Sequence, residues 1–118
     1  MENEVVTHQK FVKACKHIAI TIRENSLKYN VKNIYGVPRG GWIPAVHLSH
    51  LLDLPISLYP TKDSLIVDDI ADKGNTLSIF SGRNPIATIY YHRQSLVKPD
   101  IWVYEKKDKW IQFPWELK

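Results

Sequence analysis

The sequence predicts an α/β fold in which a mostly parallel sheet is covered on both faces. Short apolar segments, typical of buried strands, alternate along the chain with segments that have helical spacing. Such alternation is typical of right-handed strand–helix–strand units, which place their strands in parallel. The 118 residues allow one domain with one core, spanning residues 1–118. Ligands of such sheets lie beyond the carboxyl ends of the strands, so the loops that follow the strands are the candidate functional segments.

The first helix is expected over about residues 8–28. Thr7 is a favourable N-cap residue, because its side chain can accept a hydrogen bond from the first turn. Apolar side chains recur at helical spacing from Phe11 to Ile22, and the polar stretch 25–30 is expected to end the helix.

Two further helices and five strands complete the expected fold. A helix over residues 42–52 tolerates Pro44 in its first turn, and one over residues 74–80 ends at Ser81 and Gly82. The expected strands are residues 33–37, 55–59, 64–69, 86–91 and 101–105.

The charge balance limits the kinds of partner. The net charge is +4 and the isoelectric point is near 9.2, which fits either nucleic acid or a pocket for a polyphosphate substrate. The lysines are scattered, so nucleic acid is the less favoured partner. No apolar run is long enough to span a bilayer and the N-terminus is acidic, so a cytoplasmic location without a membrane partner is expected. The single cysteine, Cys15, fits a reducing compartment and a place in the core.

An acidic pair stands at the end of the third expected strand. Asp68 and Asp69 are neighbours, so their side chains point to opposite sides of the strand. Adjacent carboxylates at a strand end suit Mg²⁺, which takes one or two carboxylates and completes its shell with water and substrate oxygens.

The residues after this pair are suited to an anion. Backbone N–H groups of residues 70–76 can surround a phosphate at a helix N-terminus, with Gly74 allowing close approach and Asn75 and Thr76 adding donors. In the alternative interpretation the acidic residues, including Asp72, only cap and begin a helix. The full pattern over residues 65–77 favours the ligand site.

Two other segments are candidates. In the turn after the expected strand 33–37, Arg39 offers a guanidinium group for phosphate, and Gly40 and Gly41 leave the backbone accessible. An ordinary turn between a strand and a helix is an equally good interpretation. The aromatic segment 109–116 can stack on a planar base, although hydrophobic docking on the core is generally commoner. Of the five histidines, only His92 follows a strand towards the expected pocket.

Together these segments resemble the type I phosphoribosyltransferases, especially the small purine-specific members. Residues 65–77 resemble the family's signature for 5-phosphoribosyl-1-pyrophosphate (PRPP). Residues 38–41 look like its pyrophosphate loop, and residues 109–116 are similar to the purine-binding segment of the xanthine/guanine/hypoxanthine enzymes. The resemblance runs in order over residues 7–116.

The resemblance implies a three-layer α/β sandwich and a reaction of purine salvage. A phosphoribosyl group passes from PRPP to xanthine, guanine or hypoxanthine, pyrophosphate is released, Mg²⁺ is the cofactor and the protein is a homo-oligomer. The implied PRPP-binding residues are Arg39, Gly40, Gly41, Asp68, Asp69, Ile70, Ala71, Asp72, Lys73, Gly74, Asn75 and Thr76. Asp68 and Asp69 would hold the ribose hydroxyls and the metal, Asp72 would be the general base, and His92, Trp110 and Ile111 would bind the purine.

The chain also departs from the family pattern. His92 stands where the family usually has a lysine for the purine's exocyclic oxygen, and Arg93 next to it is a possible substitute. Lys73 stands where a threonine or serine is common. Residues 60–63 replace an edge strand and a long loop that covers the site during transfer. The alternative function is therefore a non-catalytic PRPP- or nucleotide-binding regulatory module on the same fold. A plain α/β scaffold without a ligand is the weakest hypothesis.

Overall fold

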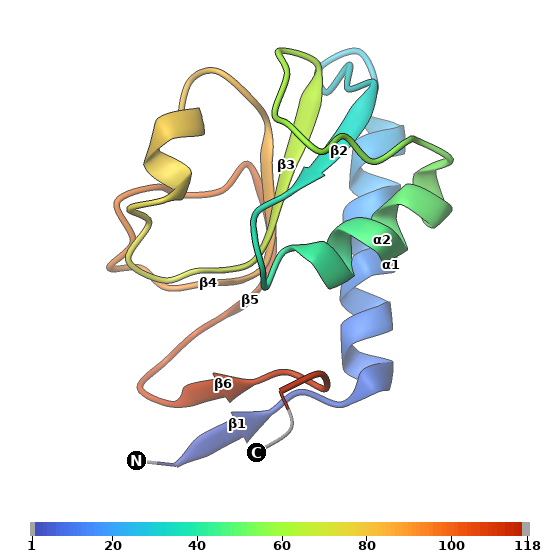
Figure 1. Ribbon diagram of the computed structural model, residues 1–118. Coiled ribbons are helices and arrows are strands. Elements are labelled where there is room, and N and C mark those ends of the chain that lie inside the picture. Colours follow the sequence, from blue (N-terminus) through green and yellow to red (C-terminus); the bar gives the residue numbers. More distant parts are fainter. Residues whose placement is uncertain (1, 117–118) are drawn as a thin grey trace.

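A four-stranded parallel sheet forms the centre of the computed structural model, which describes residues 2–116 (Figure 1). The strands lie in the order β2-β3-β4-β5, and each adjacent pair is parallel. Their bounds are Asn33–Gly36, Ser64–Ala71, Ile86–Tyr91 and Ile101–Glu105. The parallel sheet predicted from the alternating pattern is confirmed.

Helices α1 (His8–Glu24) and α2 (Trp42–Leu52) pack together on one face of the sheet (Figure 1). Thr7 caps α1 as predicted, since its side chain accepts a hydrogen bond from the Lys10 N–H at 3.1 Å. Cys15 is fully buried in this layer, and burial raises the pKa of its thiol to about 12, as expected of a core residue.

Helix α1 is shorter than the predicted range 8–28. Asn25 ends it, because its side-chain amide donates to the Thr21 carbonyl at 2.8 Å and its own N–H bonds to Thr21 and Ile22. An asparagine side chain that bonds the backbone in this way competes with helix continuation.

The other face of the sheet carries a thinner layer. Strand β3 alternates its apolar side chains, so Leu65 and Val67 face the helices while Ile66 packs with the short 3₁₀ helix η1 (Leu77–Phe80), drawn in yellow in Figure 1. Helices, sheet and this layer make the expected three-layer arrangement. The predicted helix over 74–80 is only partly right, because Gly74 has φ +82°, which no helix accommodates.

The predicted strand over 55–59 is wrong. This segment makes a single bridge, between Ile34 and Ile56, and then leaves the sheet with Leu58 and Tyr59 exposed. Strand β2 therefore forms an edge of the sheet among the residues described. Strand β3 is longer than predicted, because Ile70 and Ala71 continue to pair with β4.

A second, two-stranded parallel sheet joins the two ends of the chain. Strand β1 (Asn3–Val5) pairs with β6 (Trp110–Gln112), below the carboxyl ends of the main sheet in Figure 1. Neither strand was predicted, since three residues give too short a pattern to detect. Within residues 2–116, no helix combines the length and apolar character needed to cross a membrane.

Candidate active site

Three adjoining cavities lie along the carboxyl end of β3. The largest, of about 620 Å³, is lined by Arg39, Gly40, Trp42, Ile43, Asp69, Trp115 and Glu116. A second, of about 320 Å³, is lined by Asp68, Ile70, Leu77 and the loop from Asp72 to Thr76. The third, of about 150 Å³, is lined by Asp69, Ile70, Asp72, Lys106, Trp110, Ile111, Phe113 and Glu116. Because Asp69, Ile70 and Asp72 belong to more than one cavity, the three form one continuous site.

The cavity at the loop after β3 is lined by most of the residues expected to hold an anion. Gly74 closes the loop against its neighbour, since a Cβ at this position would overlap Ser95, and the Leu96 N–H bonds the Lys73 carbonyl at 2.9 Å. Lys73, Asn75 and Thr76 are exposed around this cavity. Of the residues expected here, Ala71 alone does not line the cavity, because it is fully buried in β3.

The acidic pair divides between two cavities. Asp68 lines the loop cavity and Asp69 the largest one, as the alternation of a strand predicts. The Asp68 carboxylate accepts a hydrogen bond from the Asp69 N–H at 2.8 Å. Burial and the neighbouring Asp69 charge raise the pKa of Asp68, and burial also raises the pKa of Asp69.

This pair fits a divalent cation held mainly by other ligands. Two crowded carboxylates with raised pKa values gain from a nearby positive charge. Across residues 2–116 no group of three His, Cys, Asp or Glu side chains is placed to hold a metal by itself. The donor set is therefore that of an ion that keeps water and substrate oxygens in its shell.

The turn after β2 packs directly against Asp69. A Cβ on Gly40 would overlap the Asp69 carboxylate, and one on Gly41 would overlap the Val67 carbonyl. The peptide bond between Pro38 and Arg39 is cis. Arg39 is exposed and makes no ion pair with the described residues, so its guanidinium can serve the largest cavity, which it lines.

The smallest cavity combines an aromatic ring with an ion-paired cluster. Trp110 is 55% exposed on β6, next to the buried Ile111. Asp72 accepts from Lys106 Nζ at 2.8 Å and contacts His92 Nδ1 at 3.0 Å. Burial alone would raise the pKa of Asp72, but the hydrogen bonds and charges of Lys106 and His92 outweigh it and lower this pKa.

His92 and its neighbour differ from their expected places. His92 contacts Asp72 but does not line the base cavity. The Arg93 Nε donates to Glu105 at 2.7 Å, away from the cavity, so Arg93 is no substitute for the family's lysine. The cation that does line the cavity is Lys106, which the sequence analysis missed. Its only signal was its place directly after the strand 101–105, at the same end of the sheet.

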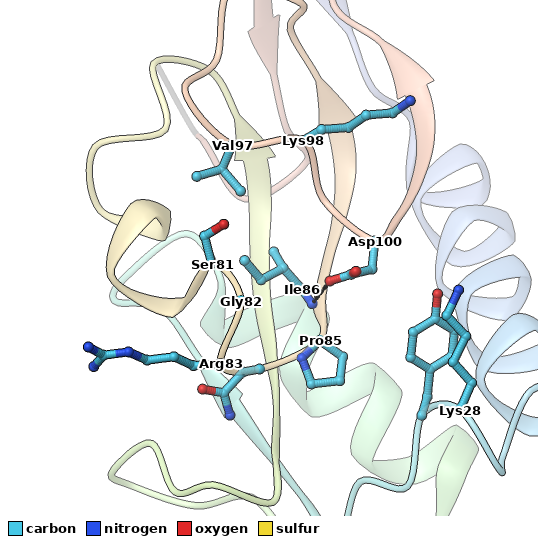
Figure 2. A pocket seen from close by; sticks show the side chains of 11 residues that line it. Lys28, Ser81, Gly82, Arg83, Pro85, Ile86, Val97, Lys98 and Asp100 are labelled. Carbon is cyan, nitrogen blue, oxygen red and sulfur yellow. Dashed lines mark hydrogen bonds between the residues drawn. The ribbon is translucent and has the colours of Figure 1, made fainter.

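Another cavity, of about 320 Å³, lies at the opposite end of the sheet, before β4 (Figure 2). The Asp100 carboxylate there accepts a hydrogen bond from the Ile86 N–H at 2.8 Å. Figure 2 shows Arg83 and Lys98 pointing away from each other, so these cations do not converge on a common ligand. We assign no ligand to it.

Comparison with solved structures gives the class of protein. A purine phosphoribosyltransferase from Pyrococcus horikoshii superposes with a TM-score of 0.84 and 32% identity, over 100% of this chain and 97% of that one. A xanthine-guanine-hypoxanthine phosphoribosyltransferase from Helicobacter pylori gives a TM-score of 0.82 over 98% of this chain and 95% of its own; at 20% identity it supports the fold alone. Fold and site together define a type I phosphoribosyltransferase.

Sequence relatives narrow the class. No family model matches the chain. A xanthine-guanine phosphoribosyltransferase from Idiomarina loihiensis is 30% identical over 115 residues, covering 73% of this chain and 71% of the relative. One from Desulfotalea psychrophila is 30% identical over 112 residues, covering 72% and 70%. The chain belongs to the purine phosphoribosyltransferases, glycosyltransferases of purine salvage, and the predicted family is confirmed.

The same alignment bears on the shortened loop. The alignment with the Idiomarina relative spans 115 positions but includes only 73% of the 118 residues of this chain. Part of the relative therefore aligns with gaps in this chain. This agrees with the expectation that the chain lacks a segment present in its family.

Proposed function

We propose that this chain transfers the phosphoribosyl group of PRPP to xanthine, guanine or hypoxanthine, with Mg²⁺ as cofactor. The observation that carries the proposal is the arrangement of the three cavities around Asp68 and Asp69. One has a phosphate-type loop, one has an exposed arginine beside two glycines, and one has an indole face. A sugar carrying phosphates at both ends, together with a planar base, requires these three environments around one point.

The cavities suggest how the substrate is held. The loop from Asp72 to Thr76 is the proposed site of the 5′-phosphate, where backbone N–H groups and Lys73 supply donors and charge. Arg39 and the glycines beside it are the proposed site of the pyrophosphate. Between them, Asp68 and Asp69 would hold the ribose hydroxyls and a Mg²⁺ ion. When bound, that ion would offset the charge of the departing pyrophosphate.

The base would stack on Trp110 with its edge along Ile111, next to the Asp72 cluster. Asp72 remains the proposed general base. Its lowered pKa makes it a weak base. A weak base suffices here, because a purine nitrogen that attacks the sugar becomes positively charged and its proton becomes acidic. Positioning of the substrates and stabilisation of the charge that develops in the transition state therefore supply most of the rate enhancement.

A regulatory role without turnover is the second candidate, and the position of residues 60–63 favours it. Thr61 is bonded to Asn33 at 3.1 Å, and its carbonyl accepts from Asn84 at 2.9 Å. Since Asn33 begins β2, this short turn is fixed at the amino end of the sheet, away from the three cavities. It cannot close over the site and exclude water, as the long loop of the family does during transfer.

An activity panel tests the proposal. The protein is incubated with PRPP, Mg²⁺ and each of the three bases, and nucleotide formation is measured beside an Asp69→Asn variant. We expect nucleotide from at least one base and a large loss in the variant. Mg²⁺-dependent binding of PRPP by calorimetry without any nucleotide would favour the regulatory module. Neither turnover nor PRPP binding would reject both.

A further inference from the structure

Lys106 is the one lysine or arginine that lines the base cavity, among the residues that the structure describes. It follows β5 directly, where its N–H bonds the Tyr91 carbonyl at 2.9 Å, so the backbone fixes its starting point. Its side chain is only 14% exposed. The Nζ atom lies 2.8 Å from Asp72 Oδ2 and 5.8 Å from the centroid of the Trp110 ring.

The neighbouring cations are directed elsewhere. Lys107 and Arg93 both pair with Glu105, at 3.2 and 2.7 Å, and Lys109 pairs with Glu2 at 3.5 Å. All three are exposed. The positive charge that a ligand stacked on Trp110 would meet is therefore that of Lys106.

We propose that Lys106 is the specificity-determining residue of the base site and that it selects purines with an oxo group at the edge facing it. The inference rests on the proposed function, because it places the base in this cavity. A lysine ammonium has three N–H donors, and Asp72 uses one of them. The remaining donors need acceptors. A ring carbonyl oxygen supplies one, whereas an exocyclic amino group presents hydrogens to the ammonium and leaves donors of both groups unpaired.

The nucleotide products IMP and AMP make a suitable pair of probes. They share the ribose phosphate and differ in whether the purine carries an oxo or an amino group. Calorimetry compares their binding to the wild type, to Lys106→Met and to Lys106→Arg. Lys107→Met is the matched control, since it removes a lysine from the same segment but outside the cavity.

We expect the wild type to prefer IMP. Lys106→Met should weaken IMP binding about 10- to 100-fold and leave AMP binding within about threefold, because one charge-assisted hydrogen bond is lost. Lys106→Arg should restore part of the preference and Lys107→Met should match the wild type. Thermal melting shows whether each variant is folded.

An unchanged IMP affinity in a folded Lys106→Met would overturn the inference, and so would an equal loss of both nucleotides. If Lys106→Met does not fold, Lys106→Arg decides. A preference for IMP over AMP that is kept at least in part supports the inference, because arginine retains a charged donor. Loss of that preference, or an equal loss of IMP and AMP binding, rejects it. Failure of the proposed function is a separate result, because a protein without turnover can still bind IMP through Lys106.

Discussion

Replacing Gly40 by alanine should impair PRPP use while leaving the fold intact. The added Cβ would overlap the carboxylate of Asp69, and that carboxylate is the free end of a side chain that can rotate away. The backbone around it need not move, so the free energy of unfolding should change little. The displaced carboxylate, however, belongs to the proposed metal and ribose site. A misplacement of about 1 Å costs about 10²-fold in rate, so we expect kcat/KM for PRPP to fall by about that factor.

Two other glycines provide controls. At Gly82 a Cβ meets nothing within 4 Å, but φ is +76°, so Gly82→Ala should cost about 1–2 kcal/mol of stability without affecting PRPP. At Gly41 the overlap is with the Val67 carbonyl and the Val37 backbone, so Gly41→Ala should destabilise the fold itself. Steady-state kinetics and thermal melts of the three variants separate the effects. A folded Gly40→Ala with wild-type kinetics would refute the role given to Asp69.

Two further predictions concern ionised groups. Burial and the Asp69 charge raise the pKa of Asp68, so the folded protein retains a proton that the unfolded chain loses, and stability falls as pH rises from 3.8 through the raised pKa. Asp68→Asn should therefore raise Tm by an amount that grows as pH rises from 3.8 to mildly alkaline values, while abolishing PRPP binding; an equal effect at every pH would contradict this. Hydrogen bonds from Tyr90 and Lys10 lower the pKa of Glu4 below 4.5 despite partial burial. The ionised Glu4 therefore stabilises the folded state above pH 4.5, and this stabilisation is lost as pH falls through the lowered pKa. Glu4→Gln should cost about 1–2 kcal/mol in urea unfolding at neutral pH, and no change would show that the contact is unimportant.

The elements with strong local signals were predictable. Strands β4 and β5 have the predicted bounds, because each is an apolar run between turn residues. The Thr7 cap was likewise a local feature. The segment 55–59 has similar apolar character but fails as a strand, since Ser57 bonds the Tyr59 carbonyl and turns the chain away from β2. Such competition between a turn and a sheet edge depends on tertiary context.

The parts of the site whose positions follow from the strand topology were predictable. Parallel strands bring their carboxyl ends to one edge, so Asp69 and the Arg39 turn were expected to meet, and Gly40 does contact the Asp69 carboxylate. The cluster of Asp72 with Lys106 was not predictable. Its members are 34 residues apart and meet only through the register of β3, β4 and β5.

A single-turnover assay tests the central claim most directly. Enzyme in excess over radiolabelled PRPP, with Mg²⁺ and xanthine, guanine or hypoxanthine in turn, reports transfer even when an open site makes turnover slow. With at least one base we expect nucleotide and pyrophosphate in equal amounts from the wild type, and a large loss of both from Asp69→Asn. PRPP that binds but is recovered unchanged, or is released as ribose 5-phosphate without nucleotide from any base, would contradict the proposed transfer.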